Sequence, residues 1–175
     1  MKKLKGNTFA YAMVFPAVVA VLGAVLVPAM IGWTAKAEAR TLSSGAKQVY
    51  VNAQAIAQEY EEKQDFALKT IYKSSGNDEL PSGITFQEEM ERKFADSADV
   101  EWCVVFSTES SSVLDAGTCV AAVYGENYEY GTYPENDSLG YYDSLEDAAY
   151  SAAKIYIEDW ADGEGENSID WDAIK

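Results

Sequence analysis

The stretch Lys5–Met30, KGNTFAYAMVFPAVVAVLGAVLVPAM, decides how the rest of the chain is interpreted. From Gly6 onward it belongs to a run of thirty consecutive uncharged residues, 6–35. A helix crosses a bilayer core with about 20 apolar residues, whereas the apolar region of a cleaved secretory signal usually has about 7 to 15. The run is therefore long enough to span a membrane and is long for a signal peptide.

The charge of the chain is divided unevenly between its ends. Of 175 residues, 48% are apolar, which leaves room for one modest domain besides this run. The first 33 residues hold Lys2, Lys3 and Lys5 and no acid, so the other 10 basic and all 29 acidic residues give the remainder a net charge of −19. Lysines before an apolar span favour a cytoplasmic N-terminus, which predicts an acidic body outside. Because that body repels phosphate backbones, no nucleic-acid partner is expected.

Residues 36–73 are predicted to continue the apolar run as one amphipathic helix. Gly45 in Ser43-Ser44-Gly45 is expected to weaken the helix, because glycine has a low helix propensity. The turn-rich segment SSGNDELPSG (74–83) is expected to end it. A helix from near residue 7 to near residue 72 would have about 66 residues, more than a small head can cover, so about half of it needs lipid or protein as a partner. The apolar positions that repeat near 3.6 residues are Val49, Ala53, Ile56, Ala57, Tyr60, Ala67, Leu68 and Ile71.

Residues 74–175 are predicted to form an acidic α+β head, with the long helix packed on a small antiparallel sheet. Thr85 with Glu88 has the pattern of a capping box before a short helix, and Asp143 with Glu146 has the pattern of a cap before the last one. Three segments have strand composition, which favours hairpins over parallel crossovers. These are VEWCVVFST (100–108), GTCVAAVY (117–124) and NYEYGTY (127–133).

Cys103 and Cys119 lie in the two strands of the predicted hairpin. If the hairpin folds symmetrically about Ser111, the two cysteines face each other at about 4.5 Å between Cα atoms, within disulfide range. The bridge would close a loop of roughly 15 residues and contribute about 3 kcal/mol. The alternative is two reduced cysteines that pack as small apolar side chains.

The composition gives no support for catalysis. There is no histidine, which excludes a His-based catalytic site and a Cys/His zinc set. Carboxylates are so frequent that a close pair is no signal of an active site. The chain is therefore not expected to be an enzyme or to need a cofactor.

The N-terminal features together resemble the type IV pilins and their pseudopilin relatives. That family has a short basic leader ending in glycine, an apolar helix with an internal proline, and an amphipathic continuation on an antiparallel sheet. By this resemblance, residues 1–6 are the leader, a prepilin peptidase cuts between Gly6 and Asn7, and residues 7–35 form the membrane and fibre-core helix. Pro28 lies 22 residues after that bond, where pilins commonly carry proline.

Two positions depart from the family pattern. The first mature residue is usually apolar and here would be Asn7, while the fifth is usually Glu and here would be Tyr11. In a pilin fibre the buried Glu is thought to meet the N-terminal amine of a neighbour, since a buried charge needs a partner. The Tyr11 hydroxyl can offer that amine only a weaker hydrogen bond. The substitution favours a minor or divergent subunit.

The resemblance implies a structural function. The chain would sit in the bacterial cytoplasmic membrane with its head outside, be processed and methylated at its N-terminus, and pack through its helix with other pilin subunits into a cell-surface filament. The first alternative is a binding or sensory domain on a permanent single-pass anchor. The second is a secreted protein, because TAKAEA (34–39) offers sites to an ordinary signal peptidase.

Two surface features are open to more than one interpretation. The acidic tail holds weak calcium candidates, against the commoner reading of a solvated charge run, and its spacing is not that of an EF-hand. Six tyrosines in YGENYEYGTYPENDSLGYY (124–142) either form a contact surface or pack on the sheet edge. The calcium candidates are Asp162, Glu164, Glu166 and Asp170, and some pseudopilins hold calcium in a C-terminal loop.

Overall fold

The computed structural model describes residues 36–61, 68–126, 128–135, 142–161 and 165–175. The chain divides into two units, 1–38 and 39–175, and nearly all of the described residues belong to the second. Within the described residues, no helix combines the length and apolar character needed to cross a bilayer. The expected leader and the apolar helix of residues 7–35 lie outside the described part.

The first described element is a helix over residues 36–61, called here the N-terminal helix. It runs without a break through Ser43-Ser44-Gly45, so the expected weak point does not interrupt the helix. Up to Tyr60 the predicted helical pattern is confirmed, because the buried positions follow the repeat of 3.6 residues on one side of the helix. Ala67 lies outside the described residues, and Leu68 is not helical. Residues with at most 6% exposure are Ala46, Val49, Ala53, Ile56, Ala57 and Tyr60.

A four-stranded antiparallel sheet forms the centre of the head, with the order β1-β2-β3-β4. The strands are β1 (Ile71–Lys73), β2 (Glu101–Phe106), β3 (Cys119–Glu126) and β4 (Glu129–Tyr133). The last three confirm the expected hairpins. The first corrects the expectation of a helix to residue 72, because Ile71, Tyr72 and Lys73 pair with Val105, Val104 and Cys103 of β2.

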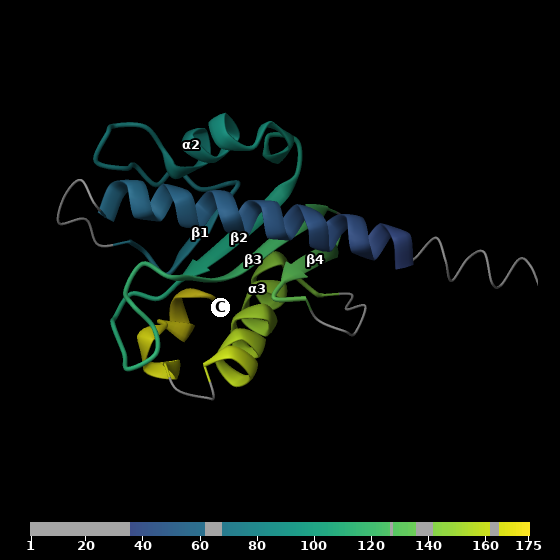
Figure 1. Cartoon of the computed structure of the whole chain (residues 1–175). Coiled ribbons are helices and arrows are strands. Elements are labelled where there is room, and N and C mark those ends of the chain that lie inside the picture. Colours follow the sequence, from purple (N-terminus) through teal and green to yellow (C-terminus); the bar gives the residue numbers. More distant parts are fainter. Residues whose placement is uncertain (1–35, 62–67, 127, 136–141, 162–164) are drawn as a thin grey trace, which may run out of the picture. The chain divides into compact units, whose positions relative to one another are not determined.

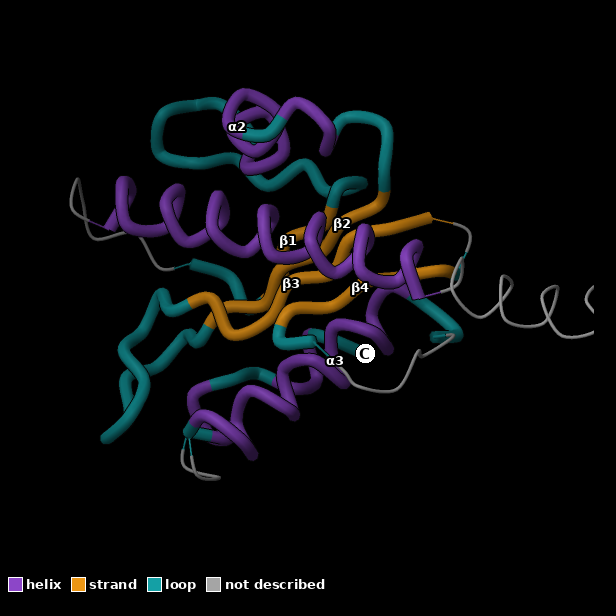
Figure 2. The backbone as a smooth tube through the Cα atoms, turned by 45° about the vertical axis from the view of Figure 1, so that its right-hand side comes forward, coloured by secondary structure: helices purple, strands orange, loops and turns teal. Residues whose placement is uncertain are grey.

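Helices cover both faces of the sheet (Figures 1 and 2). The N-terminal helix and α2 (Phe86–Lys93) share one apolar core with Trp102, Val104 and Phe106 of β2. The opposite face of the same strand, with Cys103 and Val105, packs with α3 (Leu145–Ile155). The strand is therefore buried on both sides, which explains its nearly continuous apolar sequence.

The capping box before α2 is confirmed. The Thr85 amide donates to Glu88 Oε2 over 2.8 Å, and the Glu88 amide donates to Thr85 Oγ1 over 3.1 Å. These two bonds satisfy amides that have no partner inside the helix. On the apolar side, Phe86 and Met90 are 1% and 0% exposed, and Phe94 closes the helix.

The N-cap of the last helix lies one residue later than expected. Ser144, not Asp143, is the N-cap of α3, and its side chain accepts from the Asp147 amide over 3.1 Å. Small side chains bring the helix close to the sheet, since Ala148, Ala149, Ala152 and Ala153 are fully buried. A π-helical turn, η2 (Tyr156–Trp160), continues α3, and two short 3-10 turns, η3 (Glu166–Ser168) and η4 (Trp171–Ala173), follow.

The predicted disulfide is corrected by the register of the hairpin. Cys103 pairs with Val123, and Cys119 pairs with Phe106 beyond a bulge, so the cysteines do not oppose each other. They also face different cores, Cys119 under the N-terminal helix and Cys103 under α3. Both are free and fully buried, as the alternative interpretation expected.

The physical reason for this register is an asymmetric loop. Ser107 closes it by accepting from Gly117 at its carbonyl over 2.8 Å and donating its hydroxyl to the Asp115 carbonyl over 2.6 Å. Gly117 has a φ of 83°, which favours glycine. The hairpin is therefore not centred on Ser111, and Gln54 Oε1 fixes the start of β3 by accepting from the Cys119 amide over 2.7 Å.

Candidate functional site

The two parts of the N-terminal helix differ in burial. None of residues 36–44 is buried, although all of them are helical. From Gly45 onward the buried stripe begins. The described helix is thus a scaffold for the head in its second part and is largely uncovered in its first.

Two glycines set how closely this helix approaches the sheet. A Cβ atom on Gly45 would overlap the ring of Tyr124 on β3, with Cγ only 2.8 Å away. A Cβ atom on Gly131 of β4 would overlap the helix backbone at Leu42 and Ser43. Because neither contact leaves room for a methyl group, both positions require glycine. The Ser43-Ser44-Gly45 segment is therefore a close-packing site.

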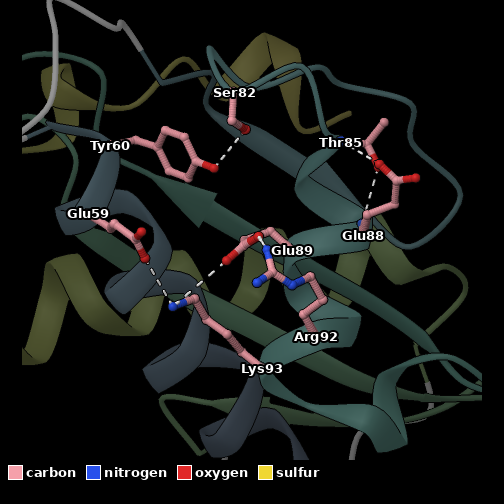
Figure 3. Close-up of polar contacts among 8 residues, drawn as sticks. All are labelled: Glu59, Tyr60, Ser82, Thr85, Glu88, Glu89, Arg92 and Lys93. Atoms are coloured by element: carbon pink, nitrogen blue, oxygen red, sulfur yellow. Dashed lines mark hydrogen bonds and ion pairs between the residues drawn. The ribbon is translucent and has the colours of Figure 1, made fainter.

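A polar cluster locks α2 to the N-terminal helix on the same side of the molecule (Figure 3). Lys93 Nζ lies 3.2 Å from Glu59 Oε2 of the helix and 3.9 Å from Glu89 Oε1 of α2. Glu89 is only 6% exposed and also accepts from Arg92 over 2.8 Å, so its charge has two cationic partners. Burying a carboxylate requires such partners.

A hydroxyl pair extends this contact to the loop before α2. Tyr60 Oη and Ser82 Oγ are 2.8 Å apart (Figure 3). Tyr60 is 6% exposed, so the bond places its polar end at the surface while its ring stays in the core. Together the two contacts hold the 74–94 segment against the helix.

On the other face, an ion pair connects β1 with α3. Lys73 Nζ donates to Glu146 Oε1 over 2.6 Å, and both side chains are 32% exposed. The bond to Lys73 lowers the pKa of Glu146, against a smaller opposing effect of burial. Sequence reasoning did not find this pair, because the strand that carries Lys73 was expected to be helical.

The weak calcium candidates do not form a site among the described residues. Glu166 pairs with Lys154, and Asp170 caps η4 by accepting from the amides of Asp172 and Ala173. Asp162 and Glu164 lie outside the described part. Within the described ranges no three carboxylate or cysteine groups are close enough together to hold a metal ion.

The tyrosines of residues 124–142, for which a contact surface and packing on the sheet edge were both open, lie in several different environments. Tyr124 lies on β3 under the N-terminal helix, and Tyr130 and Tyr133 lie on β4. Tyr130 donates to Glu101 over 2.6 Å; burial, and then this bond, raise the pKa of Tyr130 to about 12. Tyr128 is 64% exposed in the turn, Tyr142 packs against the α3 side, and Tyr141 is outside the described residues. Most of these tyrosines therefore pack on the sheet.

A shallow groove runs beside the uncovered part of the helix. Its volume is about 360 Å³, and Phe94 and Tyr124 form its apolar wall while Arg40 and Asp96 bring opposite charges to its rim. The other lining residues are small or polar. The groove has no catalytic arrangement of side chains among the described residues.

The residues assigned by the pilin resemblance, Gly6, Asn7, Tyr11 and Pro28, lie outside the described part of the chain. No protein-family model, no curated protein and no solved structure matches this sequence.

Proposed function

We propose that the chain is a structural subunit of a type IV pilus or a related filament, in a minor or divergent role. It would enter the cytoplasmic membrane through residues 7–35, lose its leader at the Gly6–Asn7 bond, and then join other subunits through its helix. The head would remain exposed on the cell surface for contacts or adhesion.

The observation that carries this proposal is the start of the N-terminal helix, which the head covers little apart from the contact of Leu42 and Ser43 with Gly131 of β4. Residues 36–44 are helical without a buried residue. Short helices are marginal in water unless packing stabilises them. Nine helical residues without a buried one are best explained if the helix continues toward the uncharged run or if a partner covers it. A filament subunit would have both.

The charge of that helix start also supports packing between copies. Residues 36–47 carry Lys36, Arg40 and Lys47 against a single acid, Glu38, in a body whose net charge is −19. A basic helix start and acidic heads are complementary surfaces on the same chain. Such complementarity favours association of copies in a fixed orientation.

Shearing of filaments from the native cells tests the proposal. We expect the chain in the sheared fraction, and we expect Gly6→Leu to keep it in the membrane with its leader attached. A matched variant, Thr8→Ser, should still reach the filaments. An intact chain that stays in the membrane in all three cases would support the anchored binding domain instead, and a free head in the medium would support the secreted protein.

A further inference from the structure

Four aromatic rings from three separate segments of the head meet at the end of β4. We call Tyr50, Tyr133, Tyr156 and Trp160 the aromatic patch. The ring centroids of Tyr50 and Tyr133 are 4.7 Å apart, those of Tyr133 and Trp160 are 6.0 Å apart, and those of Tyr156 and Trp160 are 5.3 Å apart. These spacings are those of favourable aromatic pairs. The patch is therefore a packed cluster and not a set of unrelated side chains.

The patch is anchored at one side and open at the other. Tyr50, Tyr133 and Tyr156 are half-buried, while Trp160 is 56% exposed. Trp160 ends the π-helical turn η2. Such turns are rare in proteins, and those that occur are often found at functional sites. An exposed tryptophan held by tyrosines is a typical contact residue, because little side-chain entropy remains to be lost on binding.

The electrostatics of the patch favour a positive charge. The ammonium of Lys47 lies 5.7 Å from the ring centroid of Tyr133, within the range of a cation–π contact. Glu158 and Asp159 are exposed in the same turn as Trp160. Trp160 also lies at the C-terminal end of the helical run formed by α3 and η2, where the helix dipole is negative.

We propose that the aromatic patch binds a lysine or arginine side chain presented by a partner protein. The ring faces, the helix end and the two acids attract the same sign of charge, and the chain already holds one lysine there. The open position of Trp160 suits a side chain delivered on a protein surface. The proposal does not depend on whether the chain enters a filament.

Fluorine NMR of the full-length chain in a neutral detergent tests this. With 5-fluorotryptophan, each of the four tryptophans gives its own signal, and Trp160→Phe assigns the one at the patch. The probe is an acetylated and amidated tetralysine peptide, and the matched probe is the same peptide with every side chain acetylated, which removes its charge. We expect a saturable shift of the Trp160 signal with the charged peptide alone, with the Trp102 signal unmoved.

Variants separate the patch from the general acidity of the chain. We expect Trp160→Ala to weaken binding of the tetralysine peptide about two- to five-fold by calorimetry, as for an exposed cation–π contact. Tyr128→Asn, which removes an exposed aromatic side chain elsewhere and suits the positive φ of 67°, should not weaken it.

Lys47 supplies the sharpest comparison. Lys47→Gln removes the resident cation and should tighten binding more than Lys36→Gln, which makes the same change of charge on the same helix. The proposal is overturned if the Trp160 signal does not shift, if Trp160→Ala binds as well as the unchanged chain, or if the two lysine variants behave alike.

Discussion

Gly45 of the N-terminal helix lies directly against the ring of Tyr124 on β3, with no room for a Cβ atom between them. This contact joins the helix to the sheet at the place where the buried stripe begins. It also explains why a residue that weakens helices is kept inside one. The close packing that glycine allows against Tyr124 offsets the helix propensity that alanine would add at this position.

We therefore expect Gly45→Ala to destabilise the chain. Overpacking costs about 1–3 kcal/mol, while alanine returns about 1 kcal/mol of helix propensity, so the net loss in the free energy of unfolding should be about 1 kcal/mol. Denaturant unfolding of the full-length chain in neutral detergent measures it. Ser44→Ala, at an exposed neighbouring position, is the control and should cost nothing. A stabilised Gly45→Ala variant would contradict the close contact.

The cluster around Lys93 makes a second prediction. Among the described residues, Lys93→Met leaves Arg92 as the remaining cationic contact of Glu89 and removes the link to Glu59. We therefore expect a loss of about 1 kcal/mol in the free energy of unfolding and faster amide exchange in α2. Lys175→Met is the matched control, because its partner Asp172 is 94% exposed and such pairs contribute little. Equal effects of the two substitutions would show that the cluster does not hold α2.

The Lys73–Glu146 pair predicts a dependence of stability on pH. Since Lys73 lowers the pKa of Glu146 in the folded chain, the pair stabilises the fold above the carboxyl's unfolded pKa. That contribution is lost as the pH falls through the lowered folded pKa. Glu146→Gln should therefore cost up to about 1 kcal/mol at neutral pH, after solvent screening, and progressively less in acid. Unfolding free energies of both chains across this range measure the difference, and a constant difference would argue against the pair.

The cysteines provide a test of the hairpin register. Burial raises the pKa of both thiols, so little reactive thiolate is available. We expect iodoacetamide to leave the folded chain unmodified and to alkylate Cys103 and Cys119 once the chain is unfolded without reductant. If alkylation of the unfolded chain needs a reductant first, the two cysteines are joined, and the hairpin does not have the register in which Cys103 pairs with Val123.

Local patterns predicted the elements that depend on local chemistry. The buried face of the N-terminal helix, the capping box at Thr85 and the three main strands follow from residue spacing and composition, and all are confirmed. Strand β1 was missed because Leu68 and Ile71 continue a helical spacing, and three residues are too few to show the alternation of a strand. What made Ile71–Lys73 a strand is its pairing with β2, which is a long-range effect.

The aromatic patch, the hairpin register and the Lys73–Glu146 pair could not be predicted from the sequence, because they too depend on long-range packing. Tyr50, Tyr133 and Trp160 are far apart in the chain, and only the packing of the helix, β4 and η2 brings them together. The disulfide prediction failed on a loop whose hydrogen bonds to Ser107 shift the pairing. The position of Glu146 opposite Lys73 likewise depends on how α3 crosses the sheet.

The native N-terminus tests the central claim most directly. Mass spectrometry of the chain isolated from its own cells should find a start at Asn7, carrying a methyl group, because a filament subunit must lose its leader before assembly. An intact Met1 would contradict the filament account and indicate a permanent anchor. A start near Glu38 or Arg40 would contradict it as well, since the uncharged run would then be absent from the mature protein.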